Sequence, residues 1–197
     1  MFKVLLITLT LSGQPGMVTG RAEAVGGNTV SLEGVRYRLW GVQTPEPGAM
    51  CSDDGSVPFD CDQAARDYLN ERFAEAAATT ELLPHQGHPR YADADVVRCD
   101  TQVGADQSPP AARCEVLGVA CMWTECEDRW SDLAGELVEA GLGAQVREES
   151  EGRFDEEEVG ACYGELGIWG VADGAGVARP QPHLEGCDAQ VMAAVAD

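Results

Sequence analysis

Eight cysteines are the residues of this chain with the most evident chemistry. Their number is even, and no C-x2-C pair recurs with histidine partners, so they favour a disulfide framework over a zinc site. Eight cysteines can pair in many ways, and proximity alone indicates four bonds. These are Cys51 with Cys61, Cys99 with Cys114, Cys121 with Cys126, and Cys162 with Cys187. Such bonds persist in oxidising compartments, so we expect a secreted or periplasmic protein.

One cluster of histidines and carboxylates is present in the segment HQGHPRYADAD, with His85, His88, Asp93 and Asp95. Imidazole and carboxylate groups bind transition metals, so a metal site is one interpretation. A polar loop after a helix explains the same residues, and we favour it. Motifs for nucleophilic catalysis or phosphate binding, such as G-x-S-x-G or a Walker loop, are absent from the sequence.

The elements that must position these residues follow from the periodicity of the chain. Alternating apolar residues over 19–42, broken by two glycine turns, predict a three-strand meander. A period of three to four residues predicts a helix over 62–78. Residues 94–103 and 113–121 predict an antiparallel hairpin, in which Cys99 and Cys114 lie opposite each other.

Two further helices are expected, one over 131–141 and one over 154–166. Ser131 is the N-cap candidate of the first, and Gly141 is its C-cap candidate. Strands, helix, hairpin and two helices together favour an α+β fold that is mainly β. We therefore expect a five-stranded barrel with three helices.

The length of 197 residues fits one domain rather than two. The first residues, MFKVLLITLTL, place Lys3 ahead of an apolar run, which is typical of a secretory signal, although a buried first strand is the alternative. We therefore expect a signal-like segment over 1–19, one domain over 20–170, and a Pro/Gly-rich tail over 171–197. Later apolar stretches are too short to span a membrane.

The chain is strongly acidic, with 34 acidic and 13 basic residues and a formal charge of -21. A nucleic-acid-binding protein gains much of its affinity from Lys and Arg contacts to phosphates. The charge therefore argues against tight binding of DNA or RNA. Acid-rich surfaces also occur in proteins adapted to high salt, so the charge does not by itself decide the function.

Residues 24–48, AVGGNTVSLEGVRYRLWGVQTPEPG, resemble a segment of the thermonuclease (staphylococcal-nuclease-like) family. That segment reads roughly V-x-D-G-D-T, then a strand, then x-R-L-x-G-(I/V)-D-(A/T)-P-E. The resemblance extends over residues 20–170 and implies an OB-type Greek-key barrel of five strands with three helices. Cysteines placed like Cys51 and Cys61 are similar to those of the secreted bacterial branch of this family.

The family hydrolyses phosphodiester bonds with a calcium ion held by aspartates, a glutamate acting on water, and two arginines that hold the phosphate. By resemblance, Arg38 matches the first arginine and Glu46 matches the catalytic glutamate. The calcium-binding aspartates correspond to Gly26, Asn28 and Gln43, none of which is a carboxylate. Asn28 and Gln43 keep only a carbonyl oxygen, so the calcium site is degenerate.

The second arginine of the family depends on the alignment. Matching its Y-G-R motif to residues 111–113 makes Arg113 the second arginine. Aligning Cys114 with the hairpin cysteine of the secreted branch moves the position to Pro109, and the arginine is then lost.

Three functions remain open at this point. We favour a degenerate member with weak or no phosphodiesterase activity, which acts as a monomeric binding or structural module without a cofactor and with an unknown partner. The alternative is an active nuclease that uses calcium weakly, with Arg38, Glu46 and Arg113 as catalytic residues and nucleic acid as its partner. An unrelated enzyme on the same fold is the third, because fold alone does not fix chemistry.

Overall fold

The computed structural model describes residues 16–53, 57–91, 94–104, 108–122 and 125–170. Its architecture is mixed α+β and mainly strands, as the sequence predicts. The strands are β1 (Met17–Gly20), β2 (Ala22–Gly26), β3 (Thr29–Leu32), β4 (Val35–Leu39), β5 (Val42–Gln43), β6 (Met50–Cys51), β7 (Phe59–Asp60), β8 (Val97–Gly104), β9 (Ala111–Met122), β10 (Glu125–Asp132) and β11 (Ala144–Gln145). The helices are α1 (Cys61–His85), α2 (Leu133–Glu139), α3 (Arg147–Ser150) and α4 (Asp155–Tyr163), with a 3-10 turn η1 (Pro89–Tyr91).

One mixed sheet forms the centre of the fold, with the hydrogen-bonded order β1-β8-β9-β4-β3-β2 and with β10 paired to β9. The predicted β2-β3-β4 meander and β8-β9 hairpin are both confirmed. Strands β4 and β9 run parallel, with Arg38 beside Ala111. Val30 and Leu32 on β3 are both fully buried, because alternate side chains of a strand point to the same face.

The first and last strands of this order are neighbours in the sequence. Strand β1 pairs with β8 and β2 pairs with β3, yet only Arg21 separates β1 from β2. The sheet must therefore curve until its two edge strands meet at Arg21. Among the described residues, the sheet has seven strands, and its two edge strands are not hydrogen-bonded to each other. The predicted closed barrel of five strands is therefore not confirmed.

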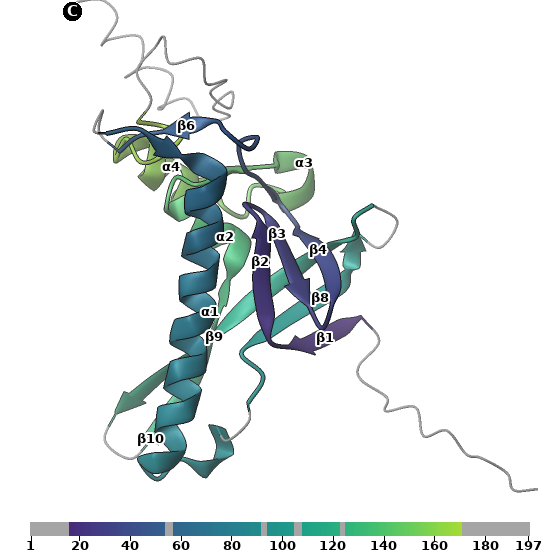
Figure 1. Cartoon of the computed structure of the whole chain (residues 1–197), viewed down its shortest axis with the longest axis vertical. Helices are drawn as coiled ribbons and strands as arrows, with labels where there is room; N and C mark the ends of the chain where they lie inside the picture. The colour runs from purple at the N-terminus through teal and green to yellow at the C-terminus, as the bar shows by residue number, and fades with distance from the viewer. Residues whose placement is uncertain (1–15, 54–56, 92–93, 105–107, 123–124, 171–197) are drawn as a thin grey trace, which may run out of the picture.

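Helix α1 is longer than the sequence predicts and runs along one side of the sheet (Figure 1). Asp60 is its N-cap, as its carboxylate accepts a hydrogen bond from a backbone N–H of the first turn. The predicted end near Ala78 is wrong, because Thr80 and Leu83 continue the buried face of the helix. The hydroxyl of Thr80 donates to the carbonyl of Ala77, which satisfies this buried polar group inside the helix.

Strand β10 is an element that the sequence pattern does not reveal. It pairs with β9 along its whole length, with Cys126 opposite Cys121. Its sequence, ECEDRWSD, is mostly polar because much of the strand is exposed, so the apolar alternation of a half-buried strand is missing. Ser131 belongs to β10, and the predicted N-cap is therefore wrong. Asp132 caps α2 instead, accepting a hydrogen bond from the Ala134 N–H at 3.0 Å.

The predicted third helix is shorter than expected and is preceded by an unexpected turn of helix. Helix α4 ends at Tyr163 rather than near residue 166, and α3 forms just before it. Helix α2 ends at Glu139 and its C-cap is Ala140, so the predicted C-cap is wrong by one residue; Gly141 follows directly and has a φ of +68°. A left-handed residue is strained for most side chains, so glycine suits this position.

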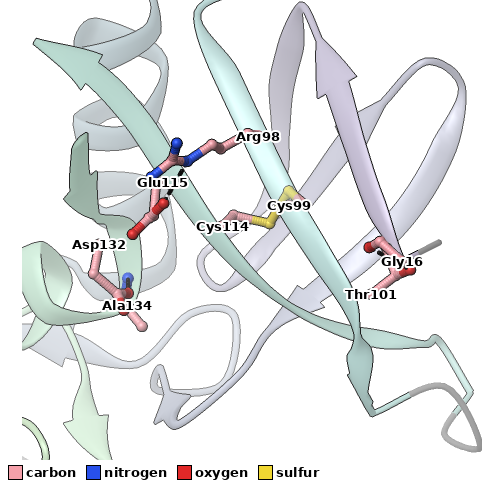
Figure 2. The surroundings of a disulfide bond; sticks show 8 residues. All are labelled: Gly16, Arg98, Cys99, Thr101, Cys114, Glu115, Asp132 and Ala134. Atoms are coloured by element: carbon pink, nitrogen blue, oxygen red, sulfur yellow. Dashed lines mark hydrogen bonds and ion pairs between the residues drawn. A yellow bond between two sulfur atoms is a disulfide. The ribbon is translucent and has the colours of Figure 1, made fainter. Parts of the chain in front are cut away.

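Three of the four predicted disulfides are confirmed, namely Cys51–Cys61, Cys99–Cys114 and Cys121–Cys126. Figure 2 shows the second of these joining β8 to β9 inside the sheet. Two hydrophobic clusters surround the buried bonds, a large one between the sheet, α1 and α2, and a small one around Cys51, Ile168 and Trp169. The fourth predicted pair, Cys162 with Cys187, extends outside the described residues.

The predicted signal-like segment and the tail over 171–197 also fall largely outside the described residues, although β1 begins at Met17. Among the helices that the structure describes, none combines the length and the apolar character needed to cross a bilayer.

Candidate functional site

A pocket of about 450 Å³ lies where the β2-β3 turn, the end of β4 and the loop after β5 meet the starts of α1 and α3. Five positions singled out by the thermonuclease resemblance line it, namely Gly26, Asn28, Arg38, Gln43 and Glu46. The lining also includes two carboxylates that the sequence pattern does not reveal, Asp62 and Glu149.

Backbone hydrogen bonds fix the position of Arg38 at the end of β4. Its N–H donates to the carbonyl of Pro110 at 3.0 Å, and the N–H of Leu39 donates to the carbonyl of Asn28 at 2.8 Å. Strand β4 is thus held between β3 and β9. The Arg38 side chain projects from this rigid base into the pocket.

The guanidinium of Arg38 is paired with the carboxylate of Glu149 through two parallel contacts. Arg38 Nη2 lies 2.6 Å from Glu149 Oε1, and Nη1 lies 3.0 Å from Oε2. Fork-to-fork pairs of this kind are among the strongest side-chain hydrogen bonds. The side chains are only 22% and 16% exposed, so the pair is partly shielded from water.

Further hydrogen bonds hold Glu149 in this orientation. Its Oε2 accepts from the Gly41 N–H at 2.9 Å, and its backbone carbonyl accepts from the Trp40 indole N–H at 3.1 Å. Gly41 has a φ of +84°, and its carbonyl accepts from the Val146 N–H at 2.9 Å. The turn that carries Glu149 is therefore fastened to the end of β4, beside Arg38.

The sequence gives no functional signal for Glu149. It lies in the first turn of α3, where acidic residues are common because they suit the positive end of the helix dipole. Only the folded chain brings it to Arg38, 111 residues away in the sequence.

Asp62, at the start of α1, also lines the pocket. Its Oδ1 accepts from the Gly27 N–H at 2.8 Å, so the start of α1 is joined to the β2-β3 turn. A Cβ atom at Gly27 would lie 2.9 Å from this carboxylate and 2.8 Å from Thr44 Oγ1. Glycine is needed here because the backbone approaches two side chains closely.

The amide of Asn28 is already engaged within the protein. Its Nδ2 donates to the Val42 carbonyl at 3.3 Å, and its Oδ1 accepts from the Thr29 hydroxyl at 3.3 Å. Gln43 is exposed on β5, opposite Ala144 of β11.

Glu46 is exposed in the loop after β5. Its backbone carbonyl accepts from the Ala49 N–H at 3.0 Å. Glu46 also lines the pocket, and within the part of the chain that the structure describes its carboxylate has no hydrogen bond or salt bridge.

These residues do not fit a calcium ion. The three family aspartate positions hold Gly26, Asn28 and Gln43, and calcium favours several oxygen ligands including carboxylates. Within the described ranges, the only group of three His, Cys, Asp or Glu ligand atoms within 4.8 Å of one another is His88, Cys121 and Cys126, which lies elsewhere.

Arg113 does not line the pocket. It lies on β9 opposite Asp100 of β8, next to the Cys99–Cys114 bond. Burial raises the pKa of the Asp132 carboxyl, and Arg153 and Arg113 partly offset that rise, so Arg113 influences the N-cap of α2 instead.

The described residues of the predicted His/Asp cluster are not brought together as one metal site. His85 and Asp95 line a separate cavity of about 490 Å³, where Asp95 accepts a hydrogen bond from Thr19 at 2.6 Å. His88 instead lies beside Cys126. Asp93 is outside the described residues.

Comparison of the sequence with protein-family models and curated proteins identifies no match. The thermonuclease resemblance therefore depends on the motif residues in this sequence.

Proposed function

We propose that this protein is an exported binding module of thermonuclease-like descent, with weak or no phosphodiesterase activity. The proposal includes the OB-type barrel, and the junction of the two edge strands at Arg21 supports it. It also includes an extracellular or periplasmic location. Three disulfides among the described residues are consistent with that location, because such bonds persist in oxidising compartments.

The observation that carries the proposal is the pairing of Arg38 with Glu149. A phosphate would have to displace a carboxylate that already occupies both ends of the guanidinium fork. That carboxylate is itself held by the Gly41 N–H, so displacing it would break a further hydrogen bond. The arginine is thus neutralised from within the protein.

The charge of the pocket agrees with this conclusion. Its lining contains the carboxylates of Glu46, Asp62 and Glu149 against the single guanidinium of Arg38. The whole chain carries a formal charge of -21. A phosphodiester would therefore approach an acidic pocket on an acidic protein, whereas a cationic or hydrogen-bond-donating ligand would be attracted.

A second function, phosphodiester hydrolysis, is favoured by one observation. Arg38 and Glu46 line the same pocket, and the carboxylate of Glu46 has no partner among the described residues. Glu46 would act on the attacking water and Arg38 would hold the phosphate, provided that Glu149 moved away. Each of these roles follows from the family resemblance alone.

Hydrolysis of single-stranded DNA and RNA by the oxidised protein separates the two functions. The assay compares the wild type with Glu46→Gln over a calcium range from trace to millimolar levels. Glu23→Gln is the matched control, because Glu23 is exposed on β2 and outside the pocket.

A binding module gives equally low rates for all three proteins at every calcium level. Cleavage by the wild type and by Glu23→Gln that disappears in Glu46→Gln would instead establish the nuclease.

A further inference from the structure

The hairpin of β9 and β10 carries a group of side chains that the pocket does not use. Cys121 and Cys126 form a disulfide across this hairpin, and His88 Nε2 lies 3.4 Å from Cys126 Sγ. The ligand atoms of these three residues all lie within 4.8 Å of one another. Figure 1 shows β10 beside the C-terminal end of α1, from which His88 follows.

This disulfide differs from the other two that the structure describes in full. Cys51, Cys61, Cys99 and Cys114 are at most 1% exposed. Cys121 is exposed and Cys126 is partly exposed. Thiol–disulfide exchange requires a thiolate to reach a disulfide sulfur, so this bond is the accessible target.

We propose that the Cys121–Cys126 disulfide is reducible in the folded protein and that its dithiol form, together with His88, binds a zinc ion. Reduction by two equivalents of a small thiol breaks the S–S bond and transfers two electrons and two protons to the two sulfurs, while the two thiols become one disulfide. Zinc then displaces the two thiol protons and is held by two thiolates and one imidazole. Exchange with a small-molecule disulfide reverses the step: the Cys121–Cys126 bond forms again, zinc is released, and the small disulfide is reduced to two thiols. Metal binding therefore follows the redox state of this pair.

The geometry suits this ion. Zinc–sulfur and zinc–nitrogen bonds of about 2.3 and 2.05 Å at a tetrahedral angle place sulfur and nitrogen about 3.6 Å apart. His88 Nε2 and Cys126 Sγ are already 3.4 Å apart. Release of the S–S bond allows Cys121 to move away from Cys126 and complete a three-ligand site with one position for water.

The surroundings hold the histidine in place and attract a cation. The hydroxyl of Tyr91 donates to Asp128 Oδ1 at 2.7 Å, which fastens the turn after His88 onto β10. Cys126 and Asp128 are two residues apart on the strand and so project from the same face. Asp128, exposed on the same face of β10 as Cys126, adds a negative charge near the site.

The test begins with selective reduction of the oxidised full chain in a glutathione buffer. Alkylation followed by peptide mass mapping identifies the first cysteines to open, and Cys121 and Cys126 are expected. Zinc affinity of the oxidised and partly reduced proteins is then measured by competition with a coloured chelator. Cobalt serves as a spectroscopic probe, since thiolate ligation gives a charge-transfer band.

Two variants give the matched comparison. His88→Ala should lower the zinc affinity of the dithiol form by at least about tenfold. Changing a residue that only hydrogen-bonds to a metal ligand already lowers metal affinity by about that much, and His88 would be a ligand itself. His85→Ala removes a nearby histidine outside the site and should leave the affinity unchanged. Circular dichroism of each variant checks that it is folded.

The proposal predicts tight zinc binding and a cobalt–thiolate band only after reduction. It is overturned if a buried disulfide opens first, if the dithiol protein binds zinc no better than a Cys121→Ser/Cys126→Ser variant, or if His88→Ala and His85→Ala behave alike. This result is independent of the pocket, so failure here leaves the hydrolysis experiment unaffected.

Discussion

Glu149 occupies both ends of the Arg38 guanidinium, with contacts of 2.6 and 3.0 Å. The two residues come from α3 and β4 and meet only in the folded chain. Removing the Glu149 carboxylate from this shielded pair would leave the Arg38 guanidinium without its partner, and an added anion could then take the place of the carboxylate. We therefore expect the pair to govern whether the pocket binds an anion.

Glu149→Gln should raise the affinity of the pocket for inorganic phosphate by about tenfold, equivalent to about 1.4 kcal/mol. The neutral amide still reaches the Gly41 N–H but no longer neutralises Arg38. An NMR titration that follows the Arg38 side chain measures the change.

Glu148→Gln is the control for that titration, because it removes the same charge from an exposed neighbour on α3. It should leave phosphate binding close to that of the wild type. An equal effect of both variants would show that overall charge, rather than the ion pair, excludes phosphate.

Two glycine-to-alanine changes should have opposite effects on stability. At Gly27 the new methyl group would meet Thr44 Oγ1 at 2.8 Å and Asp62 Oδ1 at 2.9 Å. Gly27→Ala should therefore lower the free energy of unfolding by roughly 1–3 kcal/mol and narrow the pocket. At Gly160, exposed within α4, no atom of the described residues lies within 4 Å of the new Cβ, apart from the neighbouring backbone of the helix itself. Gly160→Ala should add about 0.5–1 kcal/mol through helix propensity.

Urea unfolding at one pH measures both changes. Destabilisation by both substitutions would contradict the open environment of Gly160. A stabilised Gly27→Ala protein would contradict the close approach of β2, α1 and the loop that holds Thr44.

Local patterns in the sequence predict the parts of the fold that depend on near neighbours. The meander, the hairpin and the start of α1 follow from alternation, turn residues and helix period. Three cysteine pairs follow because each joins residues at most 15 apart in the sequence. Strand β10 escapes prediction, because an exposed strand has no apolar alternation to detect.

The candidate site is harder to predict than the fold, because its charges come from distant segments. The family motif identifies Arg38 and Glu46, which share one stretch of chain. Asp62 and Glu149 carry ordinary helix-start signals, and their role in the pocket depends on how α1 and α3 dock. Likewise, only the fold separates His85 from His88 and places the latter beside Cys126.

Asp132 should make stability depend on pH. Burial raises the pKa of its carboxyl above the usual value of about 3.9. The folded state therefore binds the Asp132 proton more tightly than the unfolded state does. The contribution of Asp132 to stability falls as the pH rises from the pKa of the unfolded state through the raised pKa of the folded state. Asp132→Asn keeps an N-cap acceptor but removes the charge. The variant should gain stability relative to the wild type as the pH rises from about 4 to about 7.

Urea unfolding of both proteins across that pH range tests the prediction. Asp60→Asn makes the same substitution at the N-cap of α1 and controls for a general effect of losing a cap charge. A relative stability of Asp132→Asn that stays constant with pH, or moves in the opposite direction, would show that the ion pair with Arg153 outweighs burial.

The Cys99–Cys114 bond should be the more stabilising of the two hairpin disulfides. It closes a separation of 15 residues, and both cysteines are buried. Figure 2 shows the bond joining β8 to β9. Constraining the unfolded chain over such a loop is worth about 3 kcal/mol, against about 2 kcal/mol for the 5-residue separation of Cys121–Cys126. Replacing Cys99 and Cys114 by alanine also removes buried sulfur atoms, which adds a cavity cost. In non-reducing urea unfolding, the Cys99→Ala/Cys114→Ala protein should therefore have a lower midpoint than a Cys121→Ala/Cys126→Ala protein. The reverse order would mean that the exposed β9-β10 hairpin contributes more to stability than its low burial indicates.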